Sequence, residues 1–385
     1  MVTSARTSAT RADAAGAAGA AALPSGVIGP AGLGLLPWLR PMLEPALQHA
    51  GSHHALLIDA PRGCGQFELA IALAQSWLCE GGPTPRAGTR AFEPACGACA
   101  ACRLVAAQTH PDLLVLLPEA DRESLGWLPG EAGEASSGAD GGATGDAGSS
   151  AASTRRKPSR EIKVEAVRQA VAFATVTRAR GRGKVVVVHP ADRMNAISAN
   201  TLLKTLEEPV GDTRFVLACG AADRLLPTVR SRCQRVPLPL PPGGVAVEWL
   251  ESKGVADADV MLAAAGGRPQ EALAMAADGI DAAAWRALPG WVHAGQAPAM
   301  LDWPLPRAVE ALLMLCHDLQ RVARGVAPRS FEVARLPPGA GPVALDRWAR
   351  DLLAVAAYAE HPVNGALTVE ALVEAGRQTW LAPVH

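Results

Sequence analysis

Two features are scarce in this 385-residue sequence, and each absence excludes a class of protein. No apolar run approaches the roughly 20 residues that a membrane-spanning helix needs, so the sequence does not predict an integral membrane protein. Net charge is also almost absent, because 36 Lys and Arg residues balance 37 Asp and Glu residues. A chain with a net charge of −1 has no overall field that would attract nucleic acid. Any contact with DNA must therefore be local or shared with partner chains.

The cysteines do not form the pattern of a disulfide-rich secreted protein. Of the eight, four are clustered and four are scattered through a long chain. This distribution favours a reducing, cytoplasmic location over a disulfide scaffold. Residues 1–30, rich in Ala, Ser, Thr and Gly, predict a disordered N-terminal extension. A signal or transit peptide is the alternative, although the run is only weakly hydrophobic.

Hydrophobic residues make up 49% of the sequence, enough for a sizeable core in two or three domains. Short apolar runs alternate with helical patterns, which is typical of strand–helix–strand units in a parallel sheet. In the helical segment before the last of these runs, Ser198 is the expected N-cap and Pro209 ends the helix. The expected strands are 55–58, 113–117, 185–188 and 215–218.

A phosphate-binding loop is expected directly after the first strand, with the pattern G-x-x-x-x-G-K-[S/T] before a helix. Gly65 is present and Gly63 lies within the loop, but Ala60 stands in place of the first glycine. Gln66 stands in place of the lysine and Phe67 in place of the hydroxyl residue. A neutral amide cannot neutralise phosphate charge, and a phenyl ring offers Mg²⁺ no oxygen. The segment is either a degenerate P-loop or an ordinary strand–turn–helix that never bound nucleotide.

The clustered cysteines have the spacing of a metal site. Cys96, Cys99 and Cys102 form C-x₂-C-x₂-C, and Cys79 lies upstream. Four thiolates make the closed tetrahedral set of a structural zinc site. An iron–sulfur cluster is the main alternative, but its common motif places the fourth Cys shortly after the third. His110 is a further candidate ligand, although four sulfurs already complete the shell.

Two motifs carry a resemblance to a known family. The segment 199–209, read ANTLLKTLEEP, and the triplet Ser231-Arg232-Cys233 together resemble the bacterial clamp-loader subunits of the AAA+ class. The resemblance is to the tau/gamma family of DNA polymerase III and, more closely, to the delta-prime family. Both families carry a four-cysteine zinc module after the P-loop helix, which agrees with the zinc interpretation of the cysteines.

The resemblance implies an α/β fold of several domains. Residues 31–240 correspond to an AAA+-like parallel sheet domain with a degenerate P-loop and a zinc module at 79–102. Residues 241–294 correspond to a small helical lid domain, and residues 295–385 to a C-terminal helical collar through which subunits form a ring. Residues 130–160 are mostly Gly, Ala, Ser and acidic residues, and predict a flexible insertion.

The nucleotide-handling residues of a working AAA+ ATPase are replaced at several positions. Besides the loop, His189 and Pro190 stand where Asp-Glu is expected, Cys219-Gly220 at a polar sensor, and Gln270 at the sensor arginine. These joint losses separate delta-prime from tau/gamma. The resemblance therefore implies no bound nucleotide and no ATPase activity of the chain's own, within a DNA-directed DNA polymerase (nucleotidyltransferase) holoenzyme.

Arg232 is the remaining chemical group. The resemblance implies that it is an arginine finger acting in trans on the ATP of a neighbouring tau/gamma subunit, with Ser231 and Cys233 supporting the turn. The implied partners are the tau/gamma and delta subunits in a hetero-oligomeric ring, with the sliding clamp and primer-template DNA contacted through the assembly. The alternatives are an active AAA+ ATPase with an unusual P-loop and a zinc-dependent interaction module without a role in replication.

Overall fold

Five short strands build one parallel sheet in the computed structural model, which describes residues 23–49, 53–82, 92–127, 158–359, 361 and 364–381. The strand order is β2-β3-β4-β1-β5. Register is continuous across the sheet, with Val186 opposite Phe215 and Phe215 opposite Ala55. The bounds are β1 Ala55–Asp59, β2 Leu113–Leu116, β3 Lys184–Val188, β4 Thr213–Cys219 and β5 Gln234–Pro237.

Alternate residues of each strand face opposite sides of the sheet, and both sides are buried. Val185 and Val187 join one core, whereas Val186 and Val188 join the other. A strand buried on both faces is a continuous apolar run, which is why the four valines are consecutive. The four expected strands are thereby confirmed, and β5 is a fifth, short strand at the edge of the sheet.

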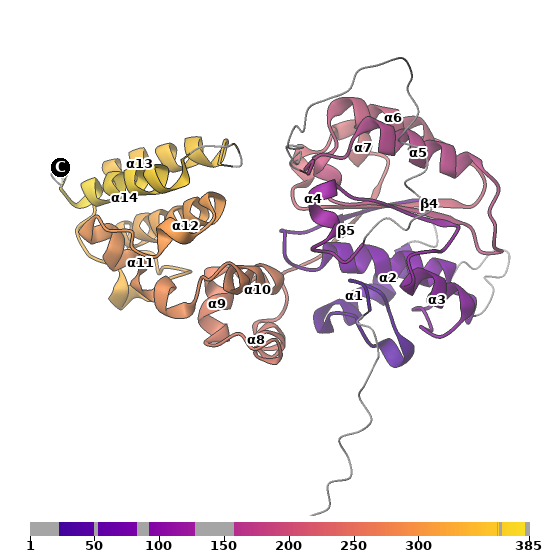
Figure 1. Cartoon of the computed structure of the whole chain (residues 1–385), viewed down its shortest axis with the longest axis horizontal. Helices are drawn as coiled ribbons and strands as arrows, with labels where there is room; N and C mark the ends of the chain where they lie inside the picture. Colours follow the sequence, from indigo (N-terminus) through magenta and orange to yellow (C-terminus); the bar gives the residue numbers. More distant parts are fainter. Residues whose placement is uncertain are drawn as a thin grey trace, which may run out of the picture.

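Helices cover the two faces separately (Figure 1). One face is covered by α1 (Arg40–His49), α2 (Gln66–Leu78) and α3 (Ala100–Ala106), and the other by α5 (Val164–Thr175), α6 (Ala196–Glu207) and α7 (Pro227–Arg230). The short α4 (Glu119–Arg122) follows β2. This arrangement is a doubly wound α/β sheet.

The C-terminal part is entirely helical and lies to one side of the sheet (Figure 1). One apolar cluster runs through all its helices, from Ala246 to Val373. The division into lid and collar stays a prediction. The bounds are α8 Gly243–Ser252, α9 Ala258–Ala264, α10 Pro269–Ala277, α11 Ala282–Ala294, α12 Leu305–Ala323, α13 Pro342–Ala356 and α14 Gly365–Leu381.

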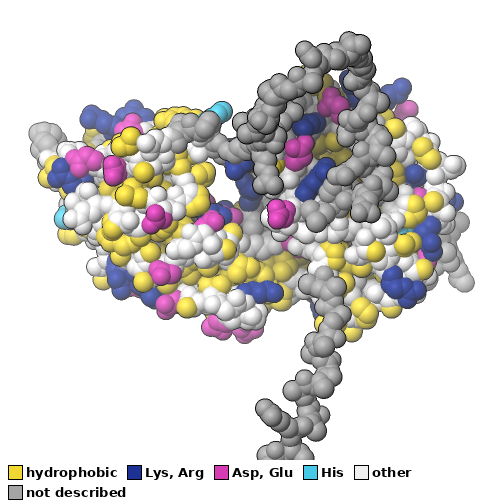
Figure 2. All heavy atoms as spheres, viewed as in Figure 1, with side chains coloured by type: hydrophobic (Ala, Val, Ile, Leu, Met, Phe, Trp, Pro, Cys, Tyr) yellow, Lys and Arg dark blue, Asp and Glu magenta, His cyan; other side chains and the backbone are white. Residues whose placement is uncertain are grey.

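The surface agrees with the low net charge. On the face shown in Figure 2, acidic and basic side chains are interspersed among hydrophobic ones over the helical part. Within the described residues, no helix combines the length and the apolar character needed to cross a bilayer.

Two expectations from the sequence are corrected. The disordered extension was expected to reach residue 30, but Val27 and Ile28 are buried, and Gln75 exchanges hydrogen bonds with the backbone of Ile28. Residues 1–22 lie outside the described part, as do residues 130–157 of the expected insertion. Ser198 does not cap α6, because Asn195 accepts the hydrogen bond from the Ser198 backbone N–H at 2.9 Å.

A buried carboxyl group joins three parts of the chain. Glu68 on α2 is 5% exposed and accepts a hydrogen bond from Gln270 Nε2 of α10 at 2.6 Å. A Cβ atom on Gly26 would lie 2.6 Å from the Glu68 Cα, so the N-terminal segment packs closely over it. Burial raises the pKa of Glu68, despite hydrogen bonds from its own backbone, Gln270 and Ser25.

This burial predicts a pH-dependent stability. Because the folded state holds the proton more tightly, the contribution of Glu68 is complete below the unfolded-state pKa and is lost as pH rises through the folded-state pKa. We expect Glu68→Gln, which keeps an oxygen acceptor for Gln270, to be more stable than the wild type above the folded-state pKa. For each unit by which the folded-state pKa exceeds the unfolded-state pKa, ionisation of Glu68 lowers the free energy of unfolding by about 1.4 kcal/mol. Urea unfolding between pH 4 and 9 measures the difference in free energy of unfolding between the variant and the wild type. Glu44→Gln, at an exposed position, is the control for the loss of one negative charge. A difference independent of pH would contradict the prediction.

Candidate functional site

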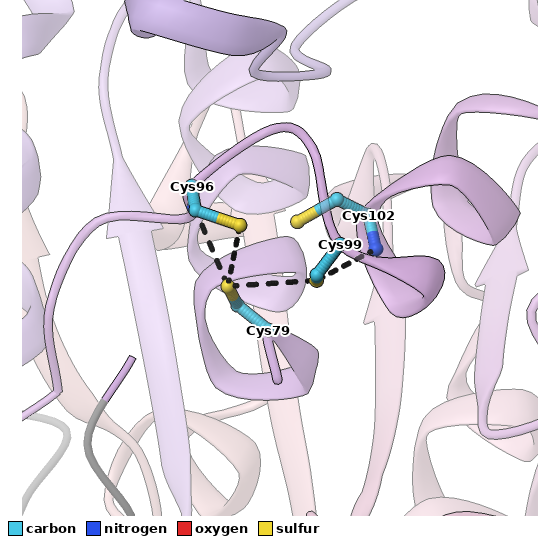
Figure 3. A group of neighbouring side chains, drawn as sticks. All are labelled: Cys79, Cys96, Cys99 and Cys102. Atoms are coloured by element: carbon cyan, nitrogen blue, oxygen red, sulfur yellow. Dashed lines mark hydrogen bonds between the residues drawn. The ribbon is translucent and has the colours of Figure 1, made fainter. Parts of the chain in front are cut away.

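Four cysteine side chains converge at the end of α2 (Figure 3). Cys79 follows this helix directly, Cys96 and Cys99 lie in the segment before α3, and Cys102 lies in the first turn of α3. All four sulfur atoms are within 4.8 Å of one another, at 3.6 Å between Cys79 and Cys96 and 3.9 Å between Cys79 and Cys99. Zn–S bonds of about 2.3 Å in a tetrahedron separate the sulfurs by about 3.8 Å. The cluster therefore has the dimensions that a zinc ion requires.

Backbone amides support thiolates in this cluster. The Cys102 N–H points at Cys99 Sγ and the Cys96 N–H at Cys79 Sγ, each at 3.4 Å. Burial raises the pKa of Cys99, but N–H groups of Cys102 and Glu80 outweigh it and bring the pKa to about 6. Thiolates are the form that binds a metal. The sequence prediction of the ligand set is matched by this geometry, whereas the identity of the metal stays a prediction.

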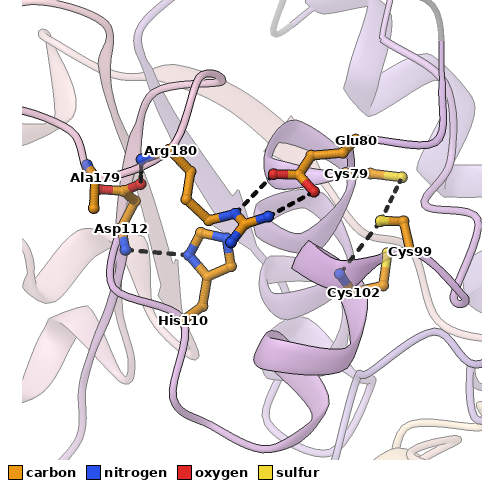
Figure 4. Close-up of polar contacts among 8 residues, drawn as sticks. All are labelled: Cys79, Glu80, Cys99, Cys102, His110, Asp112, Ala179 and Arg180. Atoms are coloured by element: carbon orange, nitrogen blue, oxygen red, sulfur yellow. Dashed lines mark hydrogen bonds and ion pairs between the residues drawn. The ribbon is translucent and has the colours of Figure 1, made fainter.

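His110 does not join the cysteines. Its Nδ1 atom accepts a hydrogen bond from the Asp112 backbone N–H at 3.1 Å, at the start of β2 (Figure 4). Burial lowers the pKa of His110, so the ring is neutral at neutral pH. His110 therefore packs at the beginning of the strand. This position agrees with the expectation that the four cysteines by themselves supply the metal ligands.

An ion pair fixes the cysteine cluster to the sheet (Figure 4). Glu80, next to Cys79, accepts two hydrogen bonds from the Arg180 guanidinium, at 2.7 and 2.9 Å. The backbone of Arg180 is held by the fully buried carboxylate of Asp112, which also accepts from the Ala179 N–H. Residue spacing gives no signal for these partners, because Glu80 and Arg180 are 100 residues apart in the sequence.

The loop after β1 is closed by its own side chain. Gln66 is buried, and its Nε2 atom donates to the carbonyl oxygens of Ala60 at 3.2 Å and Pro61 at 2.9 Å. The amide thus binds the loop's own backbone where a P-loop lysine would reach toward phosphate.

Apolar packing occupies the next position. Phe67 is buried, with its ring 6.1 Å from the Trp127 ring and 5.2 Å from the His189 ring, measured between centroids. Burial, together with the charge of Arg62, lowers the pKa of His189 to about 3. The imidazole is therefore uncharged at neutral pH. No oxygen ligand for Mg²⁺ comes from the side chains of Phe67, His189 or Pro190.

The first turn of α10 packs directly on this loop. The Gln270 N–H donates to the Gly63 carbonyl oxygen at 3.2 Å. A Cβ atom on Gly63, whose φ is +87°, would lie 3.0 Å from the Glu271 backbone nitrogen. Gln270, at the expected sensor position, directs its amide to Glu68. The neighbouring Arg268 pairs with Glu310 at 2.7 Å.

The Ser-Arg-Cys triplet lies between α7 and the edge strand β5. Arg232 donates to the Thr228 carbonyl oxygen at 2.8 Å and forms an ion pair with Glu207 at the end of α6. Its side chain is 32% exposed. Ser231 donates its hydroxyl to the Thr228 carbonyl oxygen at 3.1 Å, which closes the turn. Cys233 packs on the core, and burial raises its pKa to about 12, so it is a structural thiol.

Comparisons with known proteins agree with these features. The family model described as "DNA polymerase III, delta subunit" matches residues 38–241. The DNA polymerase III subunit delta' of Escherichia coli (strain K12) is 32% identical over 297 residues, 72% of this chain and 75% of the relative. The subunit delta' of Pseudomonas aeruginosa is 33% identical over 251 residues, 64% of this chain and 62% of the relative. The gamma/tau subunit of Mycobacterium tuberculosis (strain ATCC 25618 / H37Rv) is 28% identical over 241 residues, 60% of this chain and 34% of the relative.

These relatives define the class of protein as a subunit of DNA polymerase III. Within that class, the chain belongs to the delta-prime family. The aligned region spans 62% of the length of the Pseudomonas relative.

The cysteine geometry makes a prediction about metal content. We expect the purified chain to hold about one zinc ion and no iron, and Cys102→Ser to lose most of that metal and melt at a lower temperature. Cys316→Ser is the matched control, because Cys316 is buried in the helical part and far from the cluster in sequence. Elemental analysis measures zinc and iron per chain. Less than about half an equivalent of zinc with intact thiols would contradict the assignment, and iron would favour the cluster alternative.

Proposed function

We propose that the chain is a non-hydrolysing clamp-loader subunit of the DNA polymerase III holoenzyme. It stabilises a hetero-oligomeric ring with the tau/gamma and delta subunits and helps to load the sliding clamp onto primed DNA. Catalysis belongs to the assembly: the chain supplies Arg232 in trans to an ATP-binding neighbour. The single observation that carries the proposal is a partly exposed Ser-Arg-Cys arginine on a chain whose own loop after β1 lacks the P-loop lysine and hydroxyl.

The loop supports the absence of hydrolysis. Catalysis of phosphoryl transfer depends on positioning and on positive charge at the phosphates, from a lysine and Mg²⁺. In this chain Gln66 is neutral and turned toward the loop backbone. Phe67 is buried against other rings, so it cannot ligate a metal. The contact of α10 with Gly63 further restricts the space at the loop.

The environment of Arg232 supports delivery to a neighbour. Guanidinium remains charged at all physiological pH values and presents a planar fork to phosphate oxygens. The contact with Thr228 leaves one edge of the group directed at Glu207, whose side chain is 46% exposed. An exposed pair of this kind is worth about 1 kcal/mol or less. A neighbour's phosphate, with more negative charge, can therefore replace Glu207 at small cost.

The cysteine cluster has a separate, structural role in this proposal. Cys79, Cys96, Cys99 and Cys102 would hold Zn²⁺ as four thiolates, which closes the coordination shell and leaves no position for substrate. The ion would fix the segment between α2 and α3, and the pair of Glu80 with Arg180 would connect it to the sheet.

The test is ATP hydrolysis in a reconstituted loader stimulated by clamp and primed DNA. We expect the chain alone to be inactive. Arg232→Ala should lower turnover at the one ATP site that it faces by about 10³-fold or more, so the assembly loses the share of activity contributed by that site. Arg232→Lys should not restore it, because an ammonium lacks the forked geometry.

Arg230→Ala is the matched control, since this arginine lies two residues away and pairs with Asp223 of the same chain. Size-exclusion chromatography establishes that each variant enters the ring. Hydrolysis by the chain alone would show a motor subunit with an unusual loop. Unchanged activity of the Arg232→Ala assembly would remove the finger assignment, and failure to bind tau/gamma and delta would contradict the loader role.

A further inference from the structure

A pocket lies at the opposite end of the sheet from the loop that follows β1. The loop follows the carboxyl end of β1, whereas this pocket lies at the amino ends of β3 and β4. Its volume is about 370 Å³. Part of its lining comes from the segment after α5, including Val176 and Arg178, and part from the turn before β4, including Val210 and Asp212. Lys184, the first residue of β3, also lines it.

Lys184 is a buried cation without an anionic partner in the described part of the chain. Its side chain is 6% exposed, and Nζ lies 3.9 Å from the centroid of the Phe173 ring. Among the described residues, no oxygen accepts a hydrogen bond from Nζ. Asp212 is the acid in the pocket lining, but its carboxylate pairs with Arg178. The residue is buried as a whole, but its ammonium group opens into the pocket beside the Phe173 ring.

The rim of the pocket is apolar. The side chains of Val176 and Val210 are 61% and 52% exposed, on the two segments that border the pocket. An occupant that matches the pocket therefore carries a negative charge for Lys184 and apolar groups for the two valines.

We propose that this pocket binds an acidic peptide segment of a partner protein, with one carboxylate on Lys184 Nζ and a neighbouring apolar side chain between Val176 and Val210. Phosphate fits less well, because protein phosphate sites use backbone N–H groups or forked guanidinium groups. Here the one guanidinium of the lining is already paired, and the rim is hydrocarbon. The proposal is independent of the finger assignment, since Arg232 does not line the pocket.

The probe is the peptide acetyl-Ala-Val-Glu-Val-amide, titrated into the full-length ¹⁵N-labelled chain. We expect saturable shifts of the Gly183 and Gly211 amide signals. The Gln analogue of the peptide should bind about tenfold more weakly or worse, because it loses a charge-assisted hydrogen bond worth about 1.5–3 kcal/mol. Lys184→Met should reduce binding of the Glu peptide to the level of the Gln peptide.

Lys253→Met is the matched control, because Lys253 is an exposed lysine near a Trp249 ring on α8 and should leave binding unchanged. Val210→Ser, a surface change that spares the core, should weaken the peptide severalfold and keeps the proposal testable if Lys184→Met does not fold. Equal binding of both peptides, or no shift at Gly183 and Gly211, would overturn the proposal. Equal binding of inorganic phosphate, with no effect of Val210→Ser, would show an anion site without a peptide and would also overturn it.

Discussion

Burial of the parallel sheet on both faces is the constraint on which the other features depend. Its strands have only four to seven residues, and the inner strands β1, β3 and β4 are apolar on both sides because they contribute to two separate cores. The nucleotide loop follows the carboxyl end of β1, and the Lys184 pocket lies at the amino end of β3. The cores therefore hold both sites rigidly at opposite ends of the strands.

The altered nucleotide loop is a folded and well-packed structure. Gln66 satisfies the loop carbonyls, Phe67 fills space beside His189, and the first turn of α10 contacts Gly63. Each replacement contributes buried contacts in place of polar groups that would await a ligand. The hydrogen bond between Gln270 and Glu68 also connects the sheet domain to the helical part.

The cysteine cluster and the Ser-Arg-Cys turn show two ways of placing chemistry on such a scaffold. Cys79 follows α2, whereas Cys96 and Cys99 precede α3, and the Glu80–Arg180 pair connects this cluster to the sheet domain. The arginine lies between Val229 of α7, which is buried in the core, and Cys233, which packs against it, so both sides of its backbone are anchored. The guanidinium of Arg232 pairs with Glu207 and is partly exposed.

The sequence by itself determined the features that depend on neighbouring residues. The valine run predicts β3, the spacing of the cysteines predicts a four-sulfur cluster, and Gln66 and Phe67 predict a loop without the P-loop lysine and hydroxyl. Partners distant in sequence were decided by the tertiary structure alone. Examples are Glu207 with Arg232, Glu80 with Arg180, and the packing of Val27 on the sheet domain. Periodicity in the sequence indicates which face of a helix or strand is apolar. Only the path of the whole chain determines which charged side chain comes to lie beside a given arginine.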